Sequence, residues 1–117
     1  MDIEQVRAIC IDLLGTTESF PFDKTTLVFK TGNKMFCLLS LDDKRVNLKA
    51  PPEEVIRLIE LYDGIYPGYH MNKQHWITVD LEIFSKDSII ELLIHQSHHL
   101  IFESLPKKLQ SELKMNC

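Results

Sequence analysis

Three stretches of strand-like alternation follow one another closely in the first half of the chain, and their spacing constrains the fold more than any other feature. In "TTLVFK", "KMFCLLSL" and "RVNLK", polar and apolar residues alternate as in strands that bury one face. Gly32-Asn33 separates the first two stretches and Asp42-Asp43-Lys44 the last two, and both are typical of tight turns. Turns this short join antiparallel neighbours. We therefore predict an antiparallel meander with strands at residues 25–30, 34–41 and 45–49.

The remaining segments show the longer period of helices, with one further strand. Asp2 and Gln5 form a capping pair before one helical pattern, and Pro51-Pro52 followed by acidic residues is a strong start signal for another. Helices are predicted at residues 2–15, 51–64, 85–105 and 106–113, a loop at 16–23 and a fourth strand at 75–81. The order α-β-β-β-α-β-α-α indicates an α+β fold in which helices cover one face of an antiparallel sheet of about four strands.

The length and composition are those of one globular domain covering residues 1–117. Of the 117 residues, 44% are hydrophobic and 26% are charged, so the chain can bury a core without metal or disulfide staples. Cys10, Cys37 and Cys117 are odd in number and lack metal-binding spacing, which favours reduced thiols. The start "MDIEQVRAIC" does not resemble a signal peptide, and no apolar run could span a bilayer. A soluble cytoplasmic protein without membrane contact is expected.

The charged residues are unevenly distributed along the chain. The net charge is −4, which taken alone argues against a nucleic-acid partner. Residues 24–49, however, contain six cations and two acids, whereas the rest of the chain contains seven cations and fifteen acids. The protein is therefore predicted to be basic on one side and acidic on the other.

Alternation also predicts which side chains the uncovered face of the sheet carries. The more apolar set of each strand is assigned to the core: Leu27, Phe29, Met35, Cys37, Leu39, Val46, Leu48, Ile77 and Val79. The opposite set includes four cations and two large aromatic rings: Lys30, Lys34, Arg45, Lys49, Phe36 and Trp76. Cations that track phosphates beside rings that stack on bases are typical of surfaces for single-stranded nucleic acid. A solvated sheet face, or one covered by a loop or a second subunit, has a similar composition.

The segment "YPGYHMNKQHW", residues 66–76, concentrates the side chains that would have to carry any chemistry. Pro67 and Gly68 fit the centre of a turn. His70 and His75 could each act as a base or a metal ligand, but the segment contains no acid, serine or cysteine that would complete a catalytic group. Catalysis here is therefore the less favoured interpretation.

The residues between these histidines are better suited to binding or to turn formation. Asn72 can offer a donor and an acceptor to a ligand, or close the turn by bonding to its own backbone, while Lys73 supplies a mobile cation. The sequence contains no glycine-rich phosphate loop and no hydrolase elbow. We predict no catalytic residue, no metal ligand and no cofactor, and expect the protein not to be an enzyme.

Another group of histidines lies on the helix predicted at residues 85–105. Glu91, His95 and His98 share one stripe with Phe102, at a spacing that can bind zinc, but no fourth ligand can be identified. Histidines that face solvent or a partner are the preferred interpretation.

The segment at residues 66–76 resembles the signature of a known family. "YPGYHMNKQHWITV" is similar to the signature of the MmcQ/YjbR family of small bacterial proteins, a Pro-Gly turn, a His, Asn-Lys and a His-Trp strand. "ESFPFD", "LVFKTGNKMFCLLSL", "NLKAPPEE" and "SLPKKLQSEL" also resemble family segments, so the resemblance covers nearly the whole chain. The matching signature residues are Pro67, Gly68, His70, Asn72, Lys73, His75 and Trp76. Ser97-His98 departs from the family's frequent Ser-Tyr.

The resemblance implies a CyaY-like, "double wing" α+β fold, and members of the family are commonly labelled DNA-binding by analogy of fold, with no established enzymatic activity. We therefore expect a small non-enzymatic binding protein with nucleic acid as its leading ligand. The residues expected to contact that ligand are Lys30, Lys34, Phe36, Arg45, Lys49, His70, Asn72, Lys73, His75 and Trp76. The alternative is a protein-interaction or chaperone-like module whose sheet face is covered by a partner or by a second copy in a homodimer.

Overall fold

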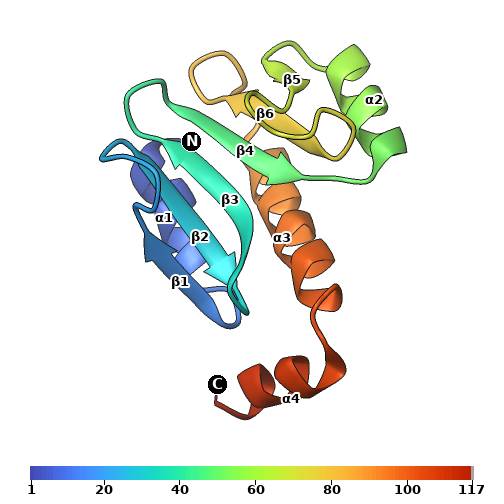
Figure 1. The fold of residues 1–117 in the computed structure, drawn as a ribbon. Helices are drawn as coiled ribbons and strands as arrows, with labels where there is room; N and C mark the ends of the chain where they lie inside the picture. Colours follow the sequence, from blue (N-terminus) through green and yellow to red (C-terminus); the bar gives the residue numbers. More distant parts are fainter. Residues whose placement is uncertain (117) are drawn as a thin grey trace.

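The computed structural model describes residues 1–116, and within that range the chain forms four helices and six strands (Figure 1). Cys117, counted above among the reduced thiols, lies outside the described residues. The elements, in chain order, are α1 Ile3–Ile11, β1 Thr16–Ser19, β2 Thr26–Thr31, β3 Lys34–Ser40, β4 Arg45–Lys49, α2 Pro52–Leu61, β5 Ile65–Pro67, β6 Trp76–Asp80, α3 Asp87–Glu103 and α4 Lys107–Met115. They build one antiparallel sheet in the order β1-β2-β3-β4-β6-β5. The predicted α+β class is confirmed, with six strands in place of about four.

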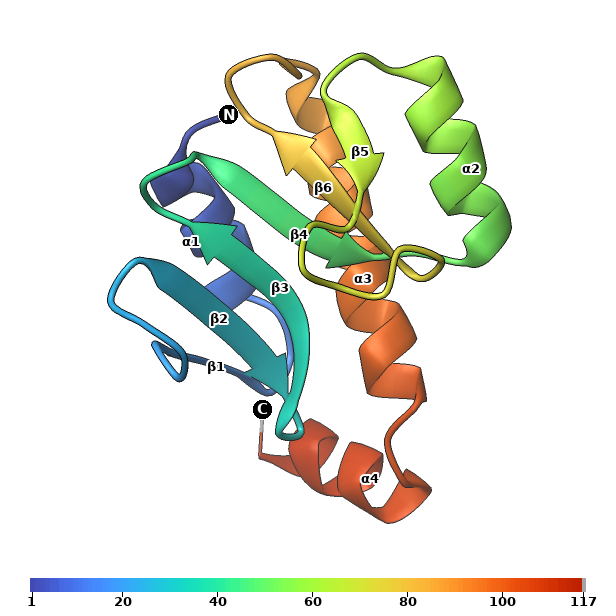
Figure 2. The same ribbon diagram turned by 45° about the horizontal axis from the view of Figure 1, so that its top comes forward.

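Helices cover one face of this sheet and leave the other face uncovered. Figures 1 and 2 show α1 and α3 behind the strands, with α2 beside β5 at one end. The main core lies between the layers and includes Val6 of α1, Leu58 of α2 and Ile94 of α3. Eight of the nine strand residues predicted for the core are there: Leu27, Phe29, Cys37, Leu39, Val46, Leu48, Ile77 and Val79. We call the uncovered side the open face; the cross-strand row Val28, Leu38, Asn47 and Thr78 runs across it.

The two strands that sequence patterning does not predict are the edge strands of the sheet. β1 pairs with β2 through contacts such as Thr16–Thr31, and β5 pairs with β6 through contacts such as Ile65–Val79. β1 has the sequence "TTES" and β5 is only three residues long, so neither shows apolar alternation. Pro67 is tolerated in β5 because an edge strand has one side without ladder hydrogen bonds.

The β2–β3 turn has the predicted chemistry and also seats the last helix. Gly32 and Asn33 both have positive φ angles, 55° and 70°, as a two-residue hairpin turn of type I′ requires. A Cβ atom on Gly32 would lie 2.5 Å from Leu105 Cδ1 and 3.2 Å from Leu109 Cδ2, so α4 and the segment before it pack directly on the turn. Within residues 1–116, no helix is both long enough and apolar enough to cross a membrane.

A β-bulge in β3 turns Phe36 away from the open face. Phe29 pairs with Cys37, whereas the next residue of β2, Lys30, pairs with Met35, which leaves Phe36 without a partner in β2. Phe36 is fully buried in the main core, with its ring centroid 6.5 Å from that of Phe29. The prediction that Phe36 lies on the open face is therefore wrong.

The same bulge exchanges the predicted positions of Met35 and Lys34. Directly paired residues share a face, so Met35 lies with Lys30 on the open face instead of in the core. Lys34 pairs with Thr31, whose hydroxyl donates to the Leu14 carbonyl at the end of the α1 segment. Lys34 therefore lies toward the helical side, and its predicted place on the open face is also wrong.

Strands β3 and β4 separate where Ser97 of α3 reaches the sheet. Their ladder ends at the pair Cys37–Leu48. One step further, the Lys49 N–H would bond directly to the Phe36 carbonyl in a continuous ladder. Instead, the Ser97 hydroxyl lies between them: it accepts from Lys49 N at 2.8 Å and donates to Phe36 O at 2.5 Å. Figure 1 shows the two strands diverging at this end, so one hydroxyl bridges the halves of the sheet.

The neighbouring His98 is buried, which corrects the prediction that it faces solvent or a partner. Its Nε2–H donates to the Leu14 carbonyl at 2.8 Å. Its ring lies edge-on to Phe36 and is stacked on Phe102, with centroid separations of 5.1 and 5.9 Å. Burial lowers the pKa of His98, so the neutral ring is the favoured form.

Candidate functional site

The loop between β5 and β6 lies over the open face and begins with a close approach between two strands. The Gly68 N–H donates to the Trp76 carbonyl at 2.8 Å, and the Met71 N–H donates to the Gly68 carbonyl at 3.2 Å. The turn is therefore centred on Tyr69 and His70, and not on Pro67 and Gly68 as predicted. A Cβ atom on Gly68 would lie 2.6 Å from Trp76 Cβ, which explains why glycine occupies this position.

Trp76 lies on the open side of the sheet, as predicted, but it is covered. Its exposed fraction is 8%, and it forms a small cluster with Val28 and Leu38, against which Met35 and Met71 pack. This cluster is separate from the main core. The indole is therefore part of the support beneath the β5–β6 loop, and its faces are not available for stacking on a ligand.

Asn47 and Thr78 hold the backbone of Tyr69 from both sides. The Tyr69 N–H donates to Thr78 Oγ1 at 2.8 Å, and Asn47 Nδ2 donates to the Tyr69 carbonyl at 3.2 Å. Thr78 Oγ1 in turn donates to Asn47 Oδ1 at 2.6 Å. Because Asn47 and Thr78 are directly opposite one another on β4 and β6, the sheet itself fixes the position of the loop.

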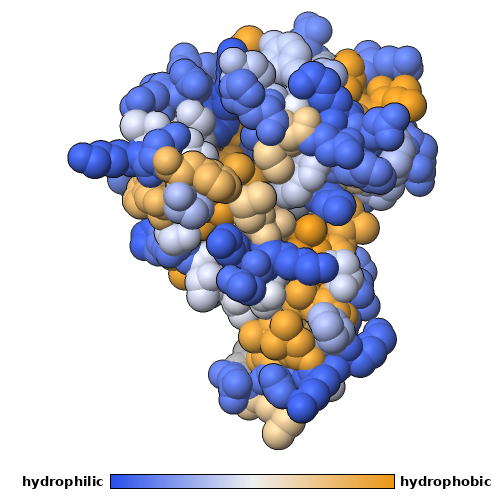
Figure 3. Space-filling view, viewed as in Figure 1, coloured by the Kyte–Doolittle hydropathy of each residue, from blue (hydrophilic) through white to orange (hydrophobic). Residues whose placement is uncertain are grey.

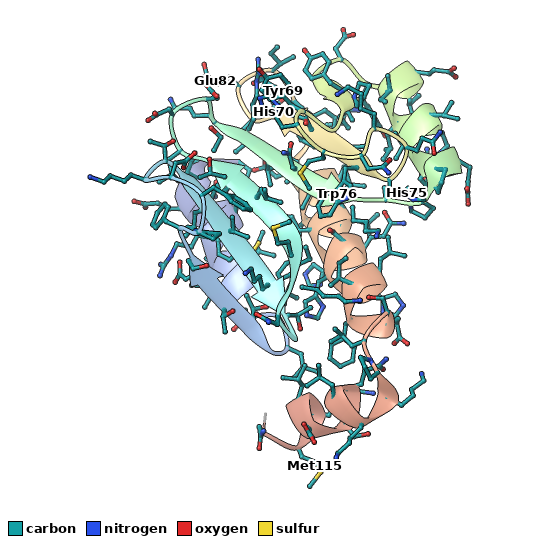
Figure 4. The ribbon with its side chains drawn as sticks, in the orientation of Figure 1. Tyr69, His70, His75, Trp76, Glu82 and Met115 are labelled. Atoms are coloured by element: carbon teal, nitrogen blue, oxygen red, sulfur yellow. The ribbon has the colours of Figure 1, made fainter. Side chains whose placement is uncertain are left out.

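The side chains of Tyr69 and His70 lie close together at the tip of this loop. Their ring centroids are 4.1 Å apart, and Figure 4 shows the two side chains next to one another, away from Trp76. His70 has a φ of 59°, in the left-handed region that non-glycine residues seldom adopt. Both side chains are exposed, so the turn directs them toward solvent.

The last part of the predicted motif has mainly structural roles. Asn72 Oδ1 accepts from the Gln74 N–H at 2.9 Å, which is the turn-closing alternative considered for this residue. His75 is half-buried, and its carbonyl accepts from the Ala50 N–H at 3.0 Å. Lys73 is exposed beside them.

A pocket of about 460 Å³ lies on the open face between this loop and the loop that joins β1 to β2. Its walls and floor are formed by Phe22, Asp23, Thr26, Met35, Leu38, Ser40, Asp43, Arg45, Asn47, Tyr69, His70, Met71 and Thr78. The floor is supplied by the sheet and the walls by the two loops. A pocket of this size with an apolar floor and a few polar groups has the usual form of a ligand site. We call it the open-face pocket.

Most of the predicted cations lie outside the pocket. Among the described residues, Lys30, Lys49 and Lys73 are absent from its lining and form no ion pair. Arg45 lies in the pocket wall, with its Nε atom 3.7 Å from Asp80 Oδ2. Figure 3 shows hydrophobic surface exposed across the middle of this side, with hydrophilic side chains around it.

Titratable groups outside the pocket include an exposed pair on α3 and two buried thiols. On α3, His95 Nε2 is 3.9 Å from Glu91 Oε1, and both side chains are exposed. Within residues 1–116, no group of three or more His, Cys, Asp or Glu side chains is arranged to hold a metal ion. Cys10 and Cys37 are buried together in the main core, where burial raises the pKa of the Cys37 thiol.

Helices on one face of an antiparallel sheet and a pocket on the other define the chain as an α+β protein with an open sheet face. A family model described as YjbR matches residues 11–100. The chain belongs to the YjbR family, which confirms the resemblance carried by the segment at residues 66–76.

Relatives and solved structures match over most of the chain. The uncharacterized protein YbdF of Escherichia coli O157:H7 is 32% identical over 115 residues, covering 95% of this chain and 93% of YbdF. The uncharacterized protein YjbR of Escherichia coli K12 is 28% identical over 110 residues, covering 92% of this chain and 93% of YjbR. The crystal structure of Deinococcus radiodurans protein DR2400, with the family-model domain DUF419, matches with a TM-score of 0.90 and 34% identity over 97% of this chain and 88% of its own. A Pseudomonas syringae protein matches with a TM-score of 0.74 and 30% identity over 86% of this chain and 99% of its own.

The structure brings some of the predicted site residues together and separates others. Arg45 and His70 line the pocket, Lys30, Lys49 and Lys73 lie outside it, and Phe36 and Lys34 leave the open face. The other pocket residues were not predicted as ligand contacts; they include Phe22, Asp23, Asp43, Tyr69 and Thr78. The alternation of β4 and β6 is consistent with the open-face position of Asn47 and Thr78, but their bonds to Tyr69 depend on a loop whose path no pattern indicates.

Proposed function

We propose that the protein is a non-enzymatic binding protein for single-stranded nucleic acid, which it holds on the open face of the sheet. The observation that carries the proposal is the open-face pocket, whose rim presents exposed aromatic rings; on the same side of the protein, Lys30, Lys49 and Lys73 form no ion pair within residues 1–116. Rings that stack on bases and cations that contact phosphates are the two components of such surfaces.

The stacking groups are the rings at the pocket rim. Tyr69 is 58% exposed and Phe22 is 64% exposed, on opposite walls of the pocket, and His70 lies against Tyr69. They replace Trp76 and Phe36, which are buried. Because the Tyr69 backbone is held by the sheet, its ring is presented without a large loss of loop entropy on binding.

The phosphate contacts lie at the other end of the strands. Lys49 pairs with Trp76 at the end of β4, four residues from Arg45, which corresponds to about 13 Å along the strand. Lys30 lies on the open face beside Met35, and Lys73 extends from the β5–β6 loop. A strand of nucleic acid could thus contact lysines while one base enters the pocket. A duplex hides its base faces by stacking, so the unpaired form is favoured.

Fluorescence anisotropy with labelled oligodeoxynucleotides tests the proposal. Three phosphate contacts give a slope of about −2 for log K against log salt, so affinity for a single strand should fall roughly twentyfold between about 50 and 200 mM salt. The duplex of the same sequence should bind more weakly. Absence of saturable single-strand binding at about 50 mM salt and tens of micromolar protein would contradict the proposal.

Variants separate the two kinds of contact. Lys49→Gln removes one phosphate contact and should reduce the salt slope by about 0.7. Tyr69→Leu keeps the backbone bonds but removes the ring, and should weaken binding about tenfold with an unchanged salt slope. Lys107→Gln is the matched control, because Lys107 is a highly exposed lysine on α4, away from the pocket.

The alternative function, a module whose open face is covered by a protein partner or a second copy, predicts different results. Light scattering would show a stable dimer, and the Tyr69 side chain would be protected from solvent in that dimer. A monomer that binds oligonucleotides supports the nucleic-acid proposal, whereas a dimer with a protected Tyr69 supports the alternative.

A further inference from the structure

The polar groups of the open-face pocket differ in charge from the surface around it. Its lining contains two carboxylates, Asp23 and Asp43, and one guanidinium, Arg45. Arg45 also has Asp80 within 3.7 Å, so the pocket as a whole does not attract a phosphate group. The part of a nucleic acid that enters is therefore not its phosphate but an uncharged part with both hydrogen-bond donors and acceptors, which is a base.

The register of the sheet places the Arg45 guanidinium and the Asp23 carboxylate at opposite ends of the pocket. Thr26 is directly opposite Ser40 on β3, and Ser40 is directly opposite Arg45 on β4. With about 5 Å between cross-strand neighbours, Arg45 and Thr26 are about 10 Å apart. Asp23 is bound to the Thr26 end of this row, because its Oδ1 accepts from the Thr26 N–H at 2.7 Å.

The Asp23 carboxylate is held in one orientation and is ionised. Oδ1 also accepts from the Thr25 N–H at 2.9 Å, while Oδ2 receives only the Thr26 hydroxyl at 3.3 Å. The backbone N–H groups of Thr25 and Thr26 lower the pKa of Asp23. One carboxylate oxygen therefore remains available as a strong acceptor.

The Arg45 guanidinium is available as a donor at the other end. Its Nε atom lies 3.7 Å from Asp80 Oδ2, and no hydrogen bond to its terminal nitrogens is found among the described residues. Between the two ends lies Ser40, and beside it on the open face Leu38, the next residue of β3 on this side, gives an apolar floor over which Met71 of the β5–β6 loop stands as a wall. A planar heterocycle can lie on this floor with its edges directed at Arg45 and Asp23.

We propose that the pocket selects guanine, an inference that rests on the proposed binding of single-stranded nucleic acid. The Arg45 guanidinium donates to O6 and N7 of the base, the usual bidentate contact of arginine with guanine. The Asp23 carboxylate accepts from N1–H and the exocyclic amino group. Adenine would direct its amino donor at the guanidinium, and cytosine and thymine offer no second adjacent donor to the carboxylate. Guanine therefore satisfies both ends of the pocket at once.

The preference is measured with oligo(dT) strands that carry one central dG, dA or dC. The dG strand should bind about tenfold more tightly than the dA and dC strands, as expected for a bidentate base contact. Arg45→Lys keeps the charge but loses the planar fork, and Asp23→Asn keeps an acceptor for the Thr25 and Thr26 N–H groups. Each should reduce the ratio of dG-strand to dA-strand affinity, measured within the same variant, to less than about twofold, whereas the control Lys107→Gln should keep the full ratio.

Free deoxyguanosine and deoxyadenosine are titrated into the protein, and binding is followed by the NMR signals of the Tyr69 and Arg45 amides. This titration tests the pocket without an oligonucleotide, so it separates failure of the inference from failure of the proposed function. Salt-dependent binding of all strands without base preference, and no response to deoxyguanosine, overturns the guanine assignment while the proposed function stands. Selective shifts with deoxyguanosine that disappear in Asp23→Asn support the guanine pocket even where no oligonucleotide binds. Equal responses to both nucleosides overturn it.

Discussion

Replacing Ser97 with alanine tests whether the hydroxyl between β3 and β4 is needed to hold the sheet open. Ser97 is fully buried, and its oxygen is the only described partner that joins the Lys49 N–H to the Phe36 carbonyl. Ser97→Ala removes both hydrogen bonds without adding volume. The two backbone groups would then face each other across a gap that is too wide for a direct bond unless the strands move.

The expected loss of stability follows from these two groups. A buried polar group left without a partner costs about 1–3 kcal/mol. Partial relaxation of the strands recovers some of this, so we expect Ser97→Ala to lower the free energy of unfolding by about 2–4 kcal/mol. With a urea m-value of about 1.5 kcal/mol/M, the midpoint should fall by about 1–3 M.

Urea unfolding followed by circular dichroism gives this midpoint, and amide hydrogen exchange reports on the Lys49 N–H directly. The control is Ser111→Ala, at an exposed position on α4, which should change stability by no more than about 0.5 kcal/mol. If Ser97→Ala behaves like this control and the Lys49 amide stays protected, β3 and β4 close without the hydroxyl, and the reasoning about the bridge is refuted.

Three further predictions concern pH, backbone packing and the loop clamp. Burial lowers the pKa of His98 from its ordinary value of 6.5, so the contribution of the neutral ring to stability is present above that pH and is lost as the pH falls. Between pH 7.5 and 5, the free energy of unfolding in urea should therefore decrease less in His98→Gln than in the unchanged chain. Gly68→Ala should lower the free energy of unfolding by about 1–3 kcal/mol, because its methyl group would meet Trp76 Cβ; a wild-type midpoint would contradict this packing. Asn47→Ala should cost about 1–2 kcal/mol and speed proteolysis near Tyr69, and unchanged cleavage kinetics would show that the clamp does not hold the loop.

Much of the fold could be predicted because the strands have one clearly apolar side. The alternation in β4 and β6 assigned Val46, Leu48, Ile77 and Val79 to the core correctly. The edge strands were missed because their short polar sequences leave no pattern to detect. Their pairing depends on the neighbouring strand and not on their own residues.

The candidate site was predicted less well because it depends on contacts between distant segments. Arg45 was placed on the open face by alternation alone, but Asp23 and Tyr69 come from loops that fold over this face. Trp76 was assigned to the correct side, but it is covered in a cluster to which Met71, from the loop before β6, contributes together with residues of β2 and β3. His98 was misplaced because its helix position borders the core, and the approach of Leu14 decides its environment.

The bulge at Phe36 means that an insertion or a deletion can change what this protein presents to a ligand without any substitution. On the two sides of the bulge, odd-numbered residues of β3 point in opposite directions: Met35 lines the pocket, whereas Cys37 lies in the core. In a chain shortened by one residue here, the bulge would be lost, and one alternation of inward and outward side chains would hold along the whole of β3. If Phe36 took the place of Met35, an aromatic ring would form the pocket floor. The number of residues in this hairpin thus decides which side chain of β3 lines the open-face pocket.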